Sequence, residues 1–451
     1  PYGDRAVQIL SRYLTDFSEE ELRECVSAAY SKEKFGGFAA PLHLLKKDTD
    51  ILELWHGPTS AFKDMALQIL PHFLTRAVRK TGEQKKSVIL VATSGDTGKA
   101  AMAGFSDVPD TEVIVFYPHG GVSDAQRLQM TTQRGNNVHA VAVEGNFDDA
   151  QTGVKLLFGK AELAAELKEQ GCAFSSANSI NWGRLVPQIV YYFSAYADAV
   201  EKGRIQNGTE IVFSVPTGNF GDILAGYYAK LMGLPVKKFI CASNSNNVLT
   251  DFINTGTYDR NREFHRTISP SMDILVSSNL ERLLYEKTEH NSEKINEWMD
   301  ALQEKGAYSI GRDIQDAVVS DFFGAWIDEI ETQETISDVF NNYGYVLDPH
   351  SAVAYKALQK YRLMTSDETY GIVLSTASPF KFSDVVLRAL YPDDYEGKVL
   401  TAFEAMDELS QKARIDIPQG LKELRGLPER ESDIVAPGEM EKEVKKILAI
   451  D

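Results

Sequence analysis

The chain has 451 residues and a formal net charge of −18, with 43% hydrophobic and 25% charged residues. These values are typical of a globular protein of two or three domains, and the acidity argues against nucleic acid or an anionic membrane as a partner. No apolar run approaches the roughly 20 residues that span a bilayer, and the three scattered cysteines fit reduced thiols in the cytoplasm, with neither a disulfide framework nor a metal site.

Helices are expected up to about residue 50, and Ser18 followed by Glu19, Glu20 and Glu21 is typical of a helix start. From Ser87 onward, short apolar runs alternate with helical patterns. The expected strands cover residues 88–92, 113–117, 137–143, 211–215, 239–242 and 372–374. This alternation predicts an α/β fold in which βαβ units build parallel sheets with helices on their faces.

The strand pattern fades between about residues 246 and 342, and we interpret this stretch as a helical insertion into the α/β body. Residues 280–284 and 322–330 are its most helical and aromatic parts. The tail after Pro392 mixes proline, glycine and charge and ends in a short amphipathic helix at residues 440–448.

The first chemical motif is HGPTSAFKDMA, residues 56–66, in which small residues precede Lys63 and an apolar helical run follows it. A lysine held at the mouth of an apolar pocket loses hydration, so its pKa falls and it becomes a usable nucleophile or Schiff-base partner. The alternative is a solvated surface lysine at a helix start.

The second motif is SVPTGNFGD, residues 214–222, which follows an expected strand and opens an expected helix. Gly218 and Gly221 permit a tight turn whose backbone N–H groups could ring an anion, and the helix N-terminus adds positive potential. Neither a Walker loop nor a G-x-G-x-x-G dinucleotide fingerprint is present in it. The alternative is an ordinary βα turn.

The third motif, TSGDTG at residues 93–98, has the same strand–turn–helix setting. The hydroxyls of Ser94 and Thr97 could hold a carboxylate or phosphate. Asp96 is unusual in an anion site unless it points away or pairs with a cation, and simple helix capping is the alternative for the whole motif.

Two further motifs carry polar groups. NSINWGR, residues 178–184, offers Asn181 and Arg184 for recognition of a charged, hydroxyl-bearing group, with a loop and helix cap as the alternative. LSTASP, residues 374–379, places Thr376 at the end of a late strand, where α/β sheets bind ligands, although such residues also form ordinary turns.

In this order, the motifs resemble those of pyridoxal-phosphate enzymes of the tryptophan-synthase-β type, and among them the threonine synthase family in its long microbial and fungal form. The resembling blocks span about residues 10–400 and read HGPTSAFKD, SGDTG, YPHGGVSDAQRLQMTT (residues 117–132), NSINWGR, SVPTGNFGD and STASPFKF.

The resemblance implies a two-domain fold-type II α/β enzyme that uses pyridoxal 5'-phosphate. Its parts would be an N-terminal helical segment (residues 1–50), a large cofactor-binding domain (51–86 and 185–405, with the insertion at about 246–342), a small domain (87–184) and a helical tail (406–451). The implied reaction converts O-phospho-L-homoserine and water to L-threonine and phosphate, the last step of threonine biosynthesis.

The resemblance also implies roles for individual residues. Lys63 would form the Schiff base with the cofactor and act as the catalytic base, and Thr376 would hydrogen-bond the pyridine nitrogen. The residues that would border the cofactor phosphate are Gly218, Asn219, Phe220, Gly221 and Asp222. The residues that would hold the substrate carboxylate and phosphate are Ser94, Asp96, Thr97, Asn181 and Arg184.

The sequence departs from the family pattern in two places. The chain begins at Pro1 without the family's usual opening segment, and Ser378 and Phe380 replace the His and Ala of the late block STAHPAKF. The alternatives are therefore a pyridoxal-phosphate-dependent dehydratase or phospho-lyase and, in another class, a non-catalytic scaffold on the same fold. We expect O-phosphohomoserine as the small-molecule partner, and a monomer or homodimer.

Overall fold

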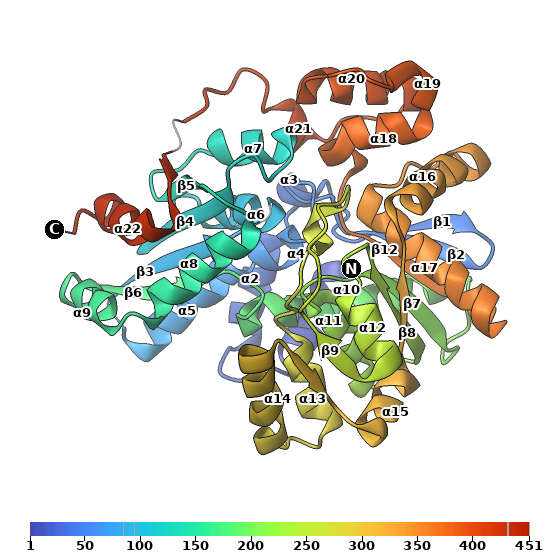
Figure 1. Ribbon diagram of the computed structural model, residues 1–451, viewed down its shortest axis with the longest axis horizontal. Coiled ribbons are helices and arrows are strands. Elements are labelled where there is room, and N and C mark those ends of the chain that lie inside the picture. The colour runs from blue at the N-terminus through green and yellow to red at the C-terminus, as the bar shows by residue number, and fades with distance from the viewer. Residues whose placement is uncertain (84, 94, 431–432, 451) are drawn as a thin grey trace.

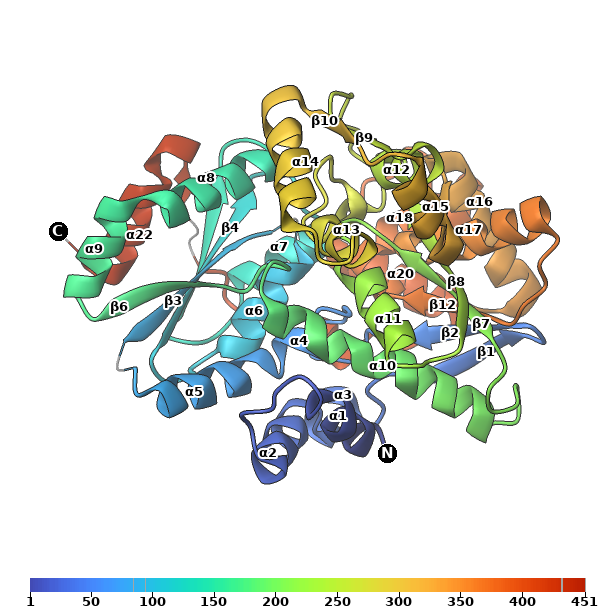
Figure 2. The ribbon, with the colours of Figure 1, turned by 90° about the horizontal axis from the view of Figure 1, so that it is seen from below.

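The computed structural model describes residues 1–83, 85–93, 95–430 and 433–450. Within these ranges the strands form a six-stranded sheet, a five-stranded sheet and a two-stranded hairpin. The two larger sheets lie in opposite halves of the molecule, with helices around each (Figures 1 and 2). Over the same ranges, the helices are all too short or too polar to cross a membrane.

The strands are β1 (Leu42–Lys46), β2 (Thr49–Glu53), β3 (Lys86–Ala92), β4 (Thr111–Pro118), β5 (Val138–Val143), β6 (Cys172–Ser176), β7 (Ile211–Pro216), β8 (Val236–Ser243), β9 (Thr257–Asp259), β10 (Ala307–Ser309), β11 (Phe322–Trp326), β12 (Gly371–Ser375) and β13 (Ile434–Val435).

The helices are α1 (Tyr2–Leu10), α2 (Glu19–Ala29), α3 (Lys32–Phe35), α4 (Asp64–Leu67), α5 (Leu70–Thr81), α6 (Asp96–Phe105), α7 (Asp124–Thr131), α8 (Phe147–Gly159), α9 (Ala161–Glu169), α10 (Trp182–Glu201), α11 (Gly221–Leu231), α12 (Val248–Thr255), α13 (Leu280–Lys287), α14 (Ser292–Lys305), α15 (Arg312–Asp321), α16 (Glu329–Tyr343), α17 (Pro349–Thr365), α18 (Ser383–Leu390), α19 (Pro392–Tyr395), α20 (Ala402–Ala413), α21 (Gln419–Lys422) and α22 (Met440–Leu448). The 3₁₀ turns are η1 (Pro270–Met272), η2 (Pro379–Phe382) and η3 (Pro437–Glu439).

The larger sheet has the order β1-β2-β12-β7-β8-β11, in which β1 and β2 form an antiparallel hairpin and the other pairs are parallel. Successive side chains of a strand point to opposite faces. Accordingly, Phe213 of β7 packs in one core cluster and its neighbour Val212 in another. Both faces of the sheet are buried, which explains the nearly continuous apolar runs of its central strands.

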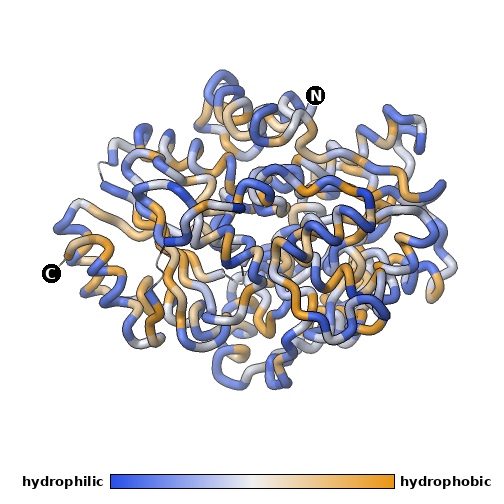
Figure 3. Tube along the Cα trace, turned by 90° about the horizontal axis from the view of Figure 1, so that it is seen from above, coloured by the Kyte–Doolittle hydropathy of each residue, from blue (hydrophilic) through white to orange (hydrophobic). Residues whose placement is uncertain are grey.

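The smaller sheet has the order β13-β5-β4-β3-β6, and all its pairs are parallel. Val88 and Leu90 of β3 face one core cluster, whereas Ile89 and Val91 face the other. The backbone trace in Figure 3 shows apolar stretches along these interior segments and polar stretches on the outer helices. The predicted α/β class and the six predicted strands are therefore confirmed.

The structure corrects the sequence interpretation at several elements, one of which is the antiparallel β9–β10 hairpin inside the stretch that was expected to be helical. Residues 42–53 form the β1–β2 hairpin instead of continuing the N-terminal helices, and β6 and β13 were not expected. Residues 322–326 were expected to be helical but form β11, which pairs with β8 at the edge of the larger sheet. Short edge strands with few alternating residues carry a weak periodic pattern, so their pairing depends on the neighbouring strand.

Two helix predictions are confirmed in detail. Ser18 and Glu21 form a reciprocal capping box at the start of α2, and α22 covers Met440–Leu448 as expected.

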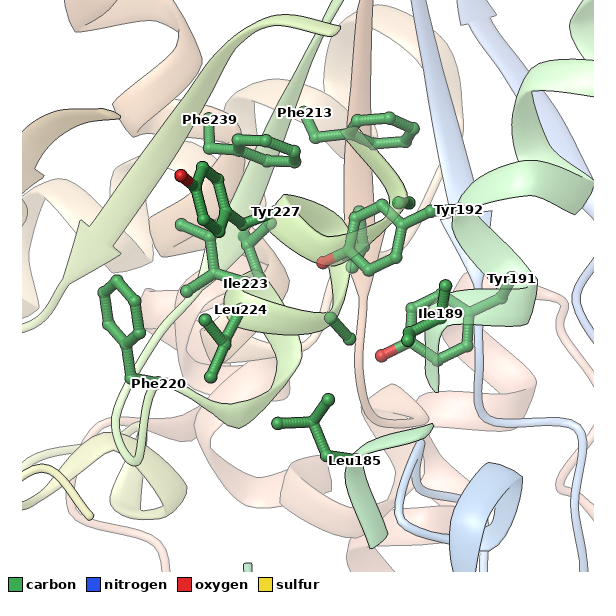
Figure 4. Packing of buried hydrophobic residues seen from close by; sticks show 14 of the residues in the cluster. Leu185, Ile189, Tyr191, Tyr192, Phe213, Phe220, Ile223, Leu224, Tyr227 and Phe239 are labelled. Atoms are coloured by element: carbon green, nitrogen blue, oxygen red, sulfur yellow. The ribbon is translucent and has the colours of Figure 1, made fainter. Parts of the chain in front are cut away.

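The core between α10, α11, β7 and β8 lies directly behind the candidate site. Figure 4 shows the rings of Phe213 and Phe239 from the two strands, with Tyr191 and Tyr192 of α10 beside α11. Loops that follow β3, β7 and β12 emerge from the C-terminal ends of parallel strands, and ligands of open α/β sheets bind at these ends.

Candidate active site

The loop before α4 holds Lys63 in a fixed position. The carboxylate of Asp64 accepts hydrogen bonds from the backbone N–H and the hydroxyl of Thr59, each at 2.8 Å. A side chain at position 57 would lie 2.5 Å from the Asp64 carboxylate, so only glycine fits there. Ser60 takes the left-handed conformation, with φ of 59°. These contacts give the motif HGPTSAFKD its local shape.

The same loop is hydrogen-bonded to the end of β12, and this brings Lys63 next to Thr376. The backbone N–H of Phe62 donates to the carbonyl of Thr376 at 2.8 Å, and the N–H of Ser378 donates to the carbonyl of Ser60 at 3.0 Å. Between them, Ala61 and Ala377 form an isolated antiparallel bridge. The backbone therefore joins two motifs that are far apart in the sequence.

The Lys63 side chain is half-buried in the wall of the cleft, and its amine is chemically available. Burial and the nearby charge of Arg184 lower the pKa of Lys63 to about 7, so a large fraction of the amine is neutral at physiological pH. Its Nζ lies 3.8 Å from the centre of the Phe62 ring. Among the described residues, no hydrogen bond or ion pair to this amine is found. A neutral, unpaired amine is a nucleophile.

The Gly-rich turn after β7 presents the start of α11 to the same cleft. Phe220 is the N-cap, adopts φ of 61° and provides no side-chain cap, so the first N–H groups of α11 lack that partner. Uncapped N–H groups at a helix N-terminus are suited to an anion. The turn therefore has the local geometry of a phosphate site.

Asp222 lies in the first turn of α11 and is held by two tyrosines. The hydroxyls of Tyr191 and Tyr192 donate to its Oδ1 at 2.5 and 2.8 Å. Burial raises the pKa of the Asp222 carboxyl to about 6, although these hydrogen bonds oppose the rise. Its Oδ2 is buried and has no partner among the described residues.

Asp96 begins α6 and pairs with a cation from the other half of the molecule. Lys381 of η2 contacts Asp96 Oδ1 at 2.7 Å, and Gln126 Nε2 donates to the same oxygen at 2.8 Å. Burial alone would raise the pKa of Asp96, but these partners lower it to about 2. The sequence left open whether Asp96 pairs with a cation, and Lys381 is that cation.

The cleft between these elements encloses about 810 Å³, open solvent at its mouth included. Ten of the residues predicted from sequence line it, namely Lys63, Asp96, Thr97, Arg184, Gly218, Asn219, Phe220, Gly221, Asp222 and Thr376. The structure thus brings together segments that follow β3, β7 and β12, the loop before α4 and the start of α10.

Two predicted residues are not part of this lining. Asn181 is the N-cap of α10, where its side chain accepts from the Gly183 N–H at 2.9 Å and donates to the Ser176 carbonyl at 2.8 Å. The alternative interpretation, that Asn181 is a helix cap, is therefore the one that the structure confirms. Ser94 lies outside the described residues.

Other lining residues were not singled out from the sequence. They include Asn178, Ser179, Gln188, Ser271 and His350. Asn178 and Ser179 belong to a motif that was noted, but a sequence gives no direction for their side chains. His350 follows the cap Asp348 at the start of α17, and this pattern indicates only a helix start.

The two residues that depart from the family's late block lie outside the lining of the cleft. Ser378 is fully buried and its hydroxyl accepts from the Phe380 N–H at the start of η2, and Phe380 packs in the core beside α17 and α18. Ser378 and Phe380 therefore help to hold the neighbouring Thr376 and Lys381 in place and do not themselves line the cleft.

The residues present fit a cofactor that carries an aldehyde and a phosphate. The unpaired Lys63 amine fits the aldehyde, and the uncapped α11 N-terminus fits the phosphate. Arg184 adds a buried positive charge whose Nε has no partner among the described residues. Burial lowers the pKa of Arg184 to about 10, so it stays charged near neutral pH.

Comparison with known proteins agrees with this geometry. Residues 51–312 match the family model "Pyridoxal-phosphate dependent enzyme", and residues 351–447 match "Threonine synthase, C-terminal". Human threonine synthase-like 1 is 41% identical over 86% of this chain, and the chain spans about half (53%) of that relative's length. Threonine synthase of Pseudomonas aeruginosa is 39% identical over 86% of this chain and 80% of its own.

Solved structures give the same result. Yeast threonine synthase has a TM-score of 0.85 at 33% identity, covering 99% of this chain and 89% of its own. PLP-bound threonine synthase from Brucella melitensis has a TM-score of 0.84 at 35% identity, covering 99% of this chain and 88% of its own. With the cleft geometry, these matches show that the chain belongs to the threonine synthase family of pyridoxal-phosphate-dependent enzymes.

Proposed function

We propose that this protein is a threonine synthase that converts O-phospho-L-homoserine and water to L-threonine and phosphate. The observation that carries the proposal is the Lys63 amine, with its pKa lowered to about 7, in one cleft with the uncapped α11 N-terminus and Thr376. In the reaction the bond between Cγ and the phosphate-ester oxygen breaks and phosphate leaves. One proton leaves Cα and later returns there, one proton leaves Cβ, and one proton is added at Cγ, which becomes a methyl group. The hydroxyl of water bonds to Cβ, and the remaining proton of water leaves with the phosphate.

Pyridoxal phosphate, when bound, supplies an electron sink that stabilises negative charge at the substrate Cα. Lys63 would hold the cofactor at its aldehyde, and the N–H groups of Gly221 and Asp222 would hold its phosphate. The Thr376 hydroxyl would hold the pyridine nitrogen through a neutral hydrogen bond. The Lys63 amine would also serve as the base that carries protons to and from the substrate carbons.

The substrate brings a carboxylate and a phosphate, and two features of the cleft suit them. Arg184 is a buried cation on the wall of the cleft. The N-cap of α6, Gly95, has no side chain, and Thr93 Oγ1 accepts from the Gly98 N–H, so the N–H groups of Asp96 and Thr97 are the ones that can bind an anion. Lys381 neutralises Asp96 at this end, which reduces repulsion between that carboxylate and an anionic substrate.

A second candidate is a phospho-lyase that acts on the same substrate without adding water at Cβ. This candidate rests on the departure of Ser378 and Phe380 from the family's late block, next to Thr376. That reaction would end in 2-oxobutyrate, ammonia and phosphate. As parts of the main proposal, the protein is cytoplasmic, in keeping with three buried free cysteines, and is a monomer or homodimer.

The test is to incubate the cofactor-loaded protein with O-phosphohomoserine and to identify the products. Threonine and phosphate in equal amounts support the synthase, whereas 2-oxobutyrate in place of threonine contradicts it and supports the phospho-lyase. A protein that stays colourless after mixing with pyridoxal phosphate contradicts both enzymes and supports the scaffold.

A matched variant tests the role of Lys63. We expect Lys63→Ala to abolish turnover while circular dichroism shows an unchanged fold, because the variant lacks the amine that binds the cofactor and moves protons. Borohydride reduction of the wild-type protein should fix the cofactor on Lys63, as read by mass spectrometry, and leave the buried Lys99 and Lys381 unlabelled because both are paired. Normal turnover of Lys63→Ala would show that the lysine is misassigned.

A further inference from the structure

Residues 269–282 pack along one side of the Gly-rich turn. This segment belongs to the stretch between β9 and α14. Ser277 Oγ donates to the carbonyl of Gly218 at 2.9 Å. A Cβ atom at Gly218 would lie 3.1 Å from the Ser271 carbonyl oxygen and 3.2 Å from Met272 Cα. The segment therefore packs directly against the backbone of the turn, so its position and that of the turn are coupled.

Asn279 holds the next residue of the turn. Its side chain is fully buried, and its Nδ2 donates to the carbonyl of Asn219 at 2.9 Å. Its Oδ1 accepts from Arg282 at 2.5 Å, and Ser278 Oγ contacts the side chain of Asn219 at 3.2 Å. The carbonyls of Gly218 and Asn219 are therefore both held by side chains of the segment.

His350 anchors the other end of the segment. Its Nε2 lies 3.1 Å from the backbone nitrogen of Ser271, and its Nδ1 lies 2.8 Å from Asp348 Oδ1. A backbone N–H can only donate, so Nε2 must accept, and the ring proton must therefore be on Nδ1 and donated to Asp348. Both ring nitrogens are thus used within the protein, although His350 lines the cleft.

We infer that His350 is a positioning residue for the Gly218–Asn219 turn. Asp348 orients the ring, the ring holds Ser271, and the 269–282 segment holds the turn in the shape that leaves its N–H groups free. The inference rests on the proposed function in one respect, that this turn receives the cofactor phosphate. Preorganised N–H groups bind an anion more tightly than mobile ones, because less ordering is required on binding.

The test measures the dissociation constant of pyridoxal phosphate by absorbance titration of the apoprotein, together with amide hydrogen exchange of peptides that cover residues 217–221 and 269–282. His350→Phe keeps a ring but removes both nitrogens. We expect it to weaken cofactor binding about tenfold, the effect of losing roughly one hydrogen bond of the stronger kind, and to speed exchange in both peptides.

Two matched variants make the result specific. In His350→Gln the amide oxygen can accept from the Ser271 N–H, so we expect binding within about twofold of wild type. His139→Phe makes the same exchange on β5 of the smaller sheet and should leave both measurements unchanged. If His350→Phe does not fold, Asn279→Ala loosens the same turn from its other end and should weaken binding by a similar factor.

Unchanged cofactor affinity and unchanged exchange at residues 217–221 in the folded His350→Phe protein, or in Asn279→Ala, would overturn the inference. Faster exchange confined to residues 269–282 would also overturn it, since the turn would then be independent of the segment. A wild-type protein that binds no pyridoxal phosphate would defeat the proposed function, while the exchange of residues 217–221 would still decide whether His350 positions the turn.

Discussion

Lys381 is fully buried between Asp96 and the carbonyl oxygen of Thr59, 2.7 and 3.1 Å away. Burying a charge without a partner costs several kcal/mol of folding free energy. Asp96 and Lys381 each offset this cost for the other. The pair joins the start of α6, which belongs to the smaller sheet, to η2, which follows β12 of the larger one. A single ionic contact thus links the two halves of the molecule beside the cleft.

We predict that Asp96→Asn alone lowers the free energy of unfolding by about 3–5 kcal/mol, because it leaves Lys381 buried and unpaired. Asp96→Asn combined with Lys381→Met should recover most of this loss, since both charges are then gone. Urea unfolding of the wild type, both single variants and the double variant gives the coupling energy. Equal and additive losses would show that the pair contributes no coupling.

The same ion pair makes the stability of the folded protein depend on pH. The pKa of Asp96 is about 2 in the folded protein and about 3.9 in an unfolded chain, so its contribution is present above about pH 4 and is lost as the pH falls toward 2. The wild type should therefore lose more stability than the double variant between pH 4 and pH 2.

At the scale of elements, α6 and α4 approach so closely that one glycine decides their spacing. A Cβ atom at Gly104 of α6 would overlap the carbonyl oxygen of Leu67, the last residue of α4. Because α4 begins directly after Lys63, this contact helps to fix the position of the lysine loop relative to the smaller sheet. Gly104 and Leu67 lie far apart in the sequence, so no local sequence pattern predicts their contact.

We predict that Gly104→Ala destabilises the protein by about 1–3 kcal/mol, because overlap with a backbone atom outweighs the usual gain of roughly 1 kcal/mol for alanine in a helix. The matched control is Gly159→Ala at the end of α8, where a Cβ atom would meet nothing within 4 Å. Thermal unfolding should show a lower Tm for the first variant and an unchanged or slightly higher Tm for the second. Equal Tm values would contradict the close approach.

At the scale of the whole molecule, the tail of the described chain is part of the smaller sheet. β13 extends that sheet next to β5, and α22 packs on α8, where Met440 Sδ occupies the space that a side chain at Gly153 would need. Figure 2 shows α22 beside α8 and α9, on the side of the smaller sheet away from the larger one. Residues of β13 and α22 thus belong to the hydrophobic cluster on one face of the smaller sheet.

We predict that Met440→Ala lowers the free energy of unfolding by about 2–5 kcal/mol, because it leaves a cavity in the cluster shared by β13, α8 and α22. Lys442→Ala, on the exposed side of the same helix, should change stability by less than about 0.5 kcal/mol. Affinity for pyridoxal phosphate should stay unchanged in both, since neither Met440 nor Lys442 lines the cleft. Equal unfolding midpoints for the two variants would contradict the docking of α22.

The sequence by itself determined the features that local patterns encode. Runs such as residues 88–92 predicted strands because they are apolar on both faces, and Ser18 with Glu21 predicted a helix start because the capping contacts are local. The motifs around Lys63, Gly218 and Thr376 indicated three parts of one site through their joint resemblance to a known family, and all three line the same cleft.

Only the tertiary structure decided contacts between distant segments. It paired Asp96 with Lys381, gave Asn181 to a helix cap, placed residues 322–326 at a sheet edge and set the 269–282 segment against the Gly-rich turn. In each case the deciding partner is remote in the chain, and the direction of a side chain depends on packing that no local pattern records. The physical reason is that residue types follow from chemistry and local geometry, whereas their pairing follows from the close packing of the whole fold.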